Sequence, residues 1–202
     1  AAIALATLMI TGGLVGGGTV KFLLFPAVES DNVVAFLTMP QESPSSVTSA
    51  AVLRLEEAAV RLGEELEAEQ GQKIYRHMLA SVGEQPFRMM QRGPAGGAAR
   101  DIGPNLGEVN IELAPSEGRT ISAVEIADRW RRLTGPIPDA VELTFTSDLI
   151  GGDKPIDIQL TGVRLDRVRA VAERLKTQLA DYPGVIDITD SFRGGKPEVK
   201  LG

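Results

Sequence analysis

Few side chains in this sequence have the types and spacing that chemistry requires. The sequence has no cysteine and one histidine, His77, so it lacks the usual ligand set of a metal cluster. No serine stands in a Gly-x-Ser-x-Gly elbow. The Gly194-Gly195-Lys196 run lacks both the earlier glycine and the following Ser or Thr of a phosphate-binding loop, and a tight turn explains it better. We expect no catalytic residue, no metal site and no cofactor, and a structural or surface role for His77.

The charged residues indicate an exposed surface. The formal net charge is −6, which argues against a nucleic-acid partner, because phosphate binding needs a basic face. Six glutamates between positions 56 and 69 recur at helical spacing beside arginines. Such pairs are typical of a solvated helix face and contribute only tenths of a kcal/mol each, about 0.2–0.5.

The glycine- and proline-rich stretch from Gly83 to Gly107 is the best functional candidate. Phe87, Met89 and Met90 lie there among three arginines. Apolar and thioether side chains adapt to varied ligands, and long structureless loops in compact domains are uncommon unless they are functional or disordered. A substrate-contacting loop and a mobile surface loop with incidental hydrophobic residues both fit this pattern.

Residues 1–25 have the composition of the end of a transmembrane helix. No charged residue occurs before Lys21, and about 20 apolar residues cross a bilayer core. Four glycines, at positions 12, 13, 16 and 17, would allow close helix–helix contact in lipid. The first acidic residue is Glu29, so this segment offers no intramembrane carboxylate for proton transfer.

The pattern over residues 26–147 predicts a ferredoxin-like βαββαβ unit of the α+β class. Several of its strands have one apolar and one polar face, which predicts a sheet covered by helices on one side only. The expected elements are a strand over 33–39, a helix from Ser45 to about Glu69, strands over 73–82 and 109–113, a helix from Thr120 or Ser122 to about Thr134, and a strand over 141–145.

Residues 148–202 begin the same order again. Strands are expected over 156–160, 185–188 and 198–201, with a helix carrying an apolar stripe from Leu165 to Leu179. This is a truncated βαββ second unit. Because the sequence starts at Ala1 and stops within a repeated unit, we expect it to be a piece of a larger membrane protein.

Several stretches, in this order and spacing, resemble the resistance–nodulation–division (RND) efflux pumps, specifically the inner-membrane permease of the hydrophobe/amphiphile type. They are Phe25-Pro26-Ala27-Val28-Glu29-Ser30-Asp31-Asn32, Leu37-Thr38-Met39-Pro40, Val141-Glu142-Leu143, Pro183-Gly184-Val185 through Asp190-Ser191-Phe192, and Gly195-Lys196-Pro197-Glu198-Val199. The resemblance implies that 1–25 end the seventh transmembrane helix, that 26–147 form the first porter subdomain of the second half, and that 148–202 begin the next one.

The resemblance also implies a function. The complete protein would be a homotrimer in the bacterial inner membrane, with residues after about 26 in the periplasm, a periplasmic adaptor and an outer-membrane channel as partners. It would exchange protons for hydrophobic or amphiphilic small molecules, with the proton-relay residues outside this chain. Phe87 would lie in the loop that separates two substrate pockets. In many drug pumps of the family this loop has two phenylalanines separated by a glycine, whereas here Arg88 and Met89 follow Phe87.

Other functions fit the sequence without the resemblance. A βαββαβ unit also forms small-molecule regulatory domains, but a membrane helix that enters the domain directly argues against a cytosolic sensor. A membrane-anchored ferredoxin-like domain that binds ligands or proteins is the main alternative. An enzyme fits least well, because no nucleophile, base and orienting group can be assembled from the sequence.

Overall fold

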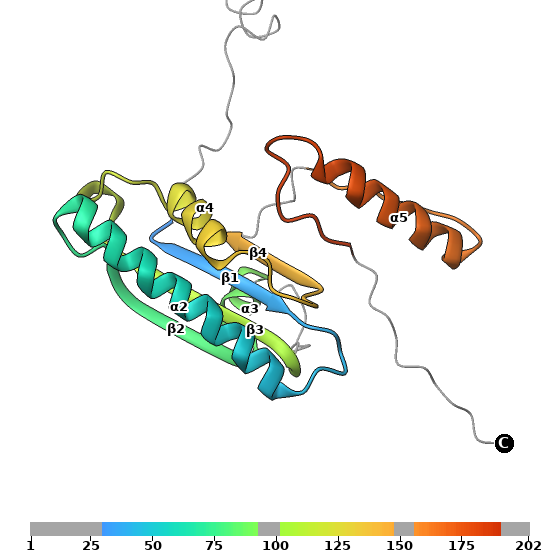
Figure 1. Cartoon of the computed structure of the whole chain (residues 1–202), viewed down its shortest axis with the longest axis horizontal. Helices are drawn as coiled ribbons and strands as arrows, with labels where there is room; N and C mark the ends of the chain where they lie inside the picture. The colour runs from blue at the N-terminus through green and yellow to red at the C-terminus, as the bar shows by residue number, and fades with distance from the viewer. Residues whose placement is uncertain (1–29, 93–101, 148–155, 191–202) are drawn as a thin grey trace, which may run out of the picture.

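The computed structural model describes residues 30–92, 102–147 and 156–190 (Figure 1). The transmembrane segment expected over 1–25, its boundary at residue 26 and the strand expected over 198–201 lie outside these residues. No described helix combines the length and apolar character needed to cross a membrane. The elements are β1 (Asn32–Thr38), α2 (Ser45–Gln70), β2 (Tyr75–Glu84), α3 (Pro86–Arg92), β3 (Ile102–Leu113), the 3₁₀ turn η2 (Ser116–Gly118), α4 (Ala123–Thr134), β4 (Glu142–Thr146) and α5 (Leu165–Ala180).

The four strands form one antiparallel sheet in the order β2-β3-β1-β4. Val34 on β1 lies opposite Asn110 on β3 and Thr146 on β4, so β1 is a central strand. The crossovers through α2 and α4 produce this order from a βαββαβ sequence, which confirms the ferredoxin-like unit and the α+β class.

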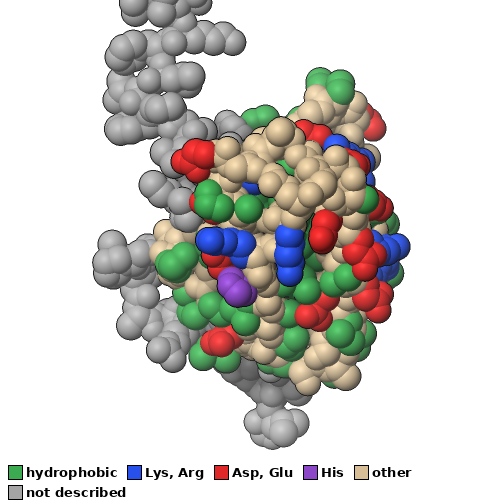
Figure 2. All heavy atoms as spheres, turned by 90° about the vertical axis from the view of Figure 1, so that its left-hand side faces the viewer, with side chains coloured by type: hydrophobic (Ala, Val, Ile, Leu, Met, Phe, Trp, Pro, Cys, Tyr) green, Lys and Arg blue, Asp and Glu red, His purple; other side chains and the backbone are tan. Residues whose placement is uncertain are grey.

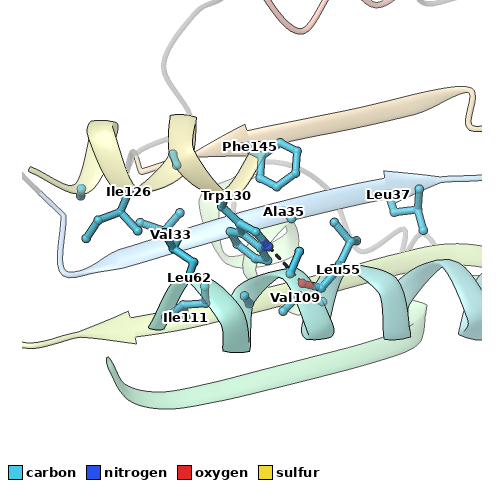
Figure 3. Packing of buried hydrophobic residues seen from close by; sticks show 14 of the residues in the cluster. Val33, Ala35, Leu37, Leu55, Leu62, Val109, Ile111, Ile126, Trp130 and Phe145 are labelled. Atoms are coloured by element: carbon cyan, nitrogen blue, oxygen red, sulfur yellow. Dashed lines mark hydrogen bonds between the residues drawn. The ribbon is translucent and has the colours of Figure 1, made fainter. Parts of the chain in front are cut away.

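Helices α2 and α4 cover one face of the sheet, and the main core lies between them and the strands (Figures 1 and 3). Trp130 of α4 is fully buried in this core and donates its indole N–H to the Leu55 carbonyl of α2 at 3.0 Å. Its ring meets Phe145 of β4 edge to face, with centroids 5.2 Å apart. Ser122 fixes the start of α4, because its hydroxyl accepts the Glu125 N–H at 3.2 Å.

The second unit is incomplete in the described chain. Helix α5 forms where the apolar stripe predicts it, but residues 156–160 and 185–188 are not strands. A strand needs a paired neighbour, and alternating side chains alone do not supply one. Asp187 also has a positive φ of 54°, which interrupts an extended conformation.

The sheet and α2 lie very close together at Gly107. A Cβ atom there would lie 2.6 Å from the Val52 Cγ2 atom of α2, and Val52 is a stiff, buried, β-branched side chain. We expect Gly107→Ala to lower the free energy of unfolding of the 202-residue chain by about 1–3 kcal/mol, measured by urea denaturation.

Two further variants test the cause. Val52→Ala removes the clashing methyl groups, so the double variant should lose less stability than the two single variants summed. Gly118→Ala is the matched control, since a Cβ at Gly118 meets nothing within 4 Å. Strictly additive losses in the double variant would contradict the proposed clash.

Candidate functional site

Within the stretch from Gly83 to Gly107, the structure describes residues 83–92 and 102–107, and these are more ordered than the sequence predicts. They include the short helix α3 and the first part of β3, which begins at Ile102, seven residues before the expected start at Val109. Pro86 occupies the first position of α3, where a missing N–H costs nothing. The glycines and proline within 102–107 predict a loop, yet pairing of β3 with β1 and β2 overrides that preference.

Helix α3 covers the second face of the sheet, opposite to α2 and α4. Phe87 of α3 forms a small apolar cluster with Val34 and Phe36, whose side chains leave β1 on this face. Phe87 is only 4% exposed. It is therefore an anchor of α3 in the described structure, and it would touch a substrate only if α3 lifted from the sheet.

A buried carboxylate holds the start of α3. The Phe87 N–H donates to both carboxylate oxygens of Glu108 on β3 at 3.0 Å, and the Arg88 N–H donates to one of them at 3.4 Å. Glu108 is 1% exposed, and this burial raises its pKa, although the two backbone N–H groups and the Arg88 charge oppose the increase. Just before α3, the Gln85 amide donates to the Leu37 and Gly107 carbonyls at 2.9 and 3.1 Å.

The Arg88 side chain fixes α3 from a second direction. Its guanidinium donates to both oxygens of Glu142 on β4, at 2.8 and 3.2 Å, and stacks over the Phe36 ring at 4.3 Å. The Thr38 hydroxyl donates to the same carboxylate at 3.4 Å. One helix of seven residues is thus tied to β1, β3 and β4.

The two methionines of α3 are more accessible than Phe87. Met90 is 62% exposed and Met89 is half-buried, with its N–H bonded to the Gln85 carbonyl at 3.1 Å. Helix α3 is therefore held firmly on the sheet while its thioether side chains are accessible to solvent. Thioether side chains in general adapt to apolar groups of varied shape and bind soft metal ions.

His77 is the other side chain that the sequence brings into question. His77, the purple side chain in Figure 2, is exposed on β2, across from Glu112 of β3. Within residues 30–92, 102–147 and 156–190, no group of three His, Cys, Asp or Glu side chains is arranged to hold a metal ion.

The sequence singles out Phe87, Met89 and Met90 as candidates, but it assigns no role to Gln85, Glu108 and Glu142, which hold α3 in place. The sequence of β1 does indicate that the second face of the sheet is covered. The run Val33-Val34-Ala35-Phe36-Leu37 is apolar without interruption, and this pattern is typical of a strand buried on both faces.

Comparison with known proteins finds similarity of structure only. No protein family and no curated protein matches the sequence. Among solved structures, a heavy metal efflux pump in one crystal form matches 90% of this chain and 18% of its own, with 16% identity and a TM-score of 0.50. A second crystal form of a heavy metal efflux pump matches 89% of this chain and 18% of its own, with 16% identity and a TM-score of 0.46. The first likeness supports the fold, and this chain spans less than a fifth of that pump.

The anchoring of α3 by Arg88 can be tested by hydrogen exchange. Arg88→Lys keeps the charge but loses the two-pronged contact with Glu142 and the planar stack on Phe36. Since a charge-assisted hydrogen bond contributes about 1.5–3 kcal/mol, we expect amide exchange over residues 85–92 to accelerate about tenfold or more. Arg76→Lys is the control, because Arg76 makes one exposed contact with Glu112 at 3.7 Å. Unchanged protection of α3 in Arg88→Lys would show that Arg88 does not hold it.

The burial of Glu108 predicts a pH dependence of stability. Because its pKa is higher in the folded than in the unfolded chain, its contribution to stability is greatest at acid pH and falls as the pH rises through the folded-state pKa. The glutamine of Glu108→Gln keeps a hydrogen-bond acceptor and does not titrate. The stability of this variant relative to wild type should therefore increase as the pH rises from the ordinary glutamate pKa to the raised folded-state pKa and stay constant above it, measured by urea denaturation. Exposed Glu117→Gln serves as control, and a pH-independent difference for Glu108→Gln would contradict the prediction.

Proposed function

We propose that this chain is a porter segment of a proton-driven RND exporter. The observation that carries the proposal is the βαββαβ sheet order together with the structural likeness to a heavy metal efflux pump over 90% of this chain. The sequence resemblance described above points to the same kind of protein. Because the chain spans 18% of that pump, transport would belong to a larger protein of which this is one part.

The proposed assembly follows the resemblance. The complete permease would be a homotrimer in the inner membrane, with residues after about 26 in the periplasm and contacts to a periplasmic adaptor and an outer-membrane channel. Proton coupling would depend on residues elsewhere, since the segment proposed to lie in the membrane contains no carboxylate before Glu29.

Within this segment we assign substrate handling to α3. Met90, and Met89 beside it, would contact hydrophobic or amphiphilic substrates, and Phe87 would hold the helix on the sheet while α3 is docked. The exposure of Met90 and the burial of Phe87 support this division of roles. Flexible thioether side chains fit substrates of varied shape.

A metal ion is the second candidate substrate, and one observation favours it while another opposes it. The structural neighbour is a heavy metal efflux pump, and thioethers are ligands for soft ions such as Cu(I). The described residues, however, offer no cluster of three carboxylate or imidazole ligands for a harder ion. The test must therefore include both substrate classes.

Met90→Ala in the complete protein tests the role of α3. In an efflux-deficient bacterial host, we expect resistance to some bulky aromatic amphiphilic compounds to change about two- to tenfold, since a contact between a thioether sulfur and an aromatic ring contributes about 0.3–1.5 kcal/mol. Protein level and oligomeric state should stay unchanged, because Met90 is exposed. Leu53→Ala, at an exposed apolar position of α2 on the other side of the sheet, is the matched control.

The panel of compounds distinguishes the alternatives. A change confined to Cu(I) and Ag(I) would identify a metal exporter, and no change for any compound would remove α3 from substrate handling. If the complete protein itself confers no resistance, the exporter proposal fails. Small-molecule binding or partner capture without transport would then favour the membrane-anchored interaction domain.

A further inference from the structure

The segment that follows α5 contacts the first unit at Asp187. The carboxylate of Asp187 accepts two hydrogen bonds from the Arg131 guanidinium of α4, at 3.1 and 2.8 Å. It also accepts the backbone N–H of Phe145 on β4 at 3.2 Å. Asp187 thus meets a helix and a strand that lie more than 40 residues earlier in the chain.

This contact closes part of the open edge of β4. Phe145 pairs with Ala35 on its inner side, while its N–H bonds to Asp187 and its carbonyl accepts from Arg131 at 3.2 Å. A neighbouring strand would supply the same two interactions, one acceptor and one donor. The ion pair therefore takes the place of backbone partners at this edge.

The same segment is also tied to α5. Lys176 of α5 donates to the Asp190 carboxylate at 2.8 Å. No side chain of α5 is buried, and Figure 1 shows α5 apart from the helix-covered sheet. Among the described residues, polar contacts of residues 185–190 therefore connect α5 with the first unit.

We propose that residues 185–190 form a strap that sets the position of α5 relative to the sheet, and that the Asp187–Arg131 contact is its releasable end. Arg131 and Asp187 are each 21% exposed, so water and salt reach both partners of the pair, whereas the carboxylates that hold α3, Glu108 and Glu142, are 1% and 7% exposed. Breaking the pair frees the strap without opening the core. In the exporter, a role that rests on the proposed function, this release lets the two porter units separate.

Asp187→Asn and Asp187→Gly test the strap. Asparagine keeps the shape and tolerates the positive φ of 54°, while glycine removes the side chain without backbone strain. Arg131 is less suitable for mutation, because it also bonds Asp128 within α4. The matched control is Asp181→Asn, at an exposed aspartate just after α5.

The measurement is the distance between spin labels on α4 and α5 by pulsed electron resonance. Labels are attached at Val124→Cys and Ala170→Cys, both exposed, in a cysteine-free version of the complete protein. We expect one narrow peak in the distance distribution of the labelled protein that retains Asp187. We expect this peak to be lost in both Asp187 variants. Raising the salt concentration to about 1 M should broaden the wild-type peak, because the screening length falls to about 3 Å.

Each outcome decides the proposal. An unchanged peak in Asp187→Gly would overturn the strap whether or not the protein transports anything. Broadening by Asp181→Asn as well would show a general loss of order and would also overturn it. A peak lost only in the Asp187 variants, in a protein that confers no resistance, would support the strap and reject the exporter function.

Discussion

Strand β1 is buried on both of its faces, and the other elements of the first unit are arranged around this constraint. Val33, Ala35 and Leu37 face the core beneath α2 and α4, whereas Val34 and Phe36 face the opposite side. A helix-covered antiparallel sheet usually leaves its second face to water. Here apolar side chains occupy both faces of the central strand, so a second cover is required. Helix α3 supplies it with Phe87.

Covering the second face of the sheet buries two carboxylates, and groups of α3 provide their hydrogen-bond and ion-pair partners. Glu108 and Glu142 lie on that face and are almost fully buried. A buried carboxylate is costly unless it is hydrogen-bonded or paired. The first N–H groups of α3 satisfy Glu108, and Arg88 satisfies Glu142. The cover and the two carboxylates therefore depend on each other, and replacing one partner leaves the other charge buried.

The sequence predicts the parts of this fold that depend on local pattern. The strand at 33–39, the helix from Ser45 and the βαββαβ order follow from periodicity, and Ser122 caps the later helix as predicted. The start of β3 does not, because pairing with β1 and β2 decides it against local glycine and proline preferences. Helix α3 does not either, because it depends on long-range contacts with β3 and β4. The strands expected over 156–160 and 185–188 differ for the converse reason, since their pattern meets no partner strand in the described chain.

The two attachments in this chain differ in how water reaches them. The α3 attachment depends on buried carboxylates and a buried phenyl ring, so breaking it exposes apolar surface and unpaired charge together. The Asp187–Arg131 attachment exposes one ion pair and two edge groups of Phe145, all of which water can satisfy. Separation at the second attachment therefore costs far less free energy than separation at the first. Motion of the chain should concentrate between β4 and α5, with α3 moving as part of the sheet.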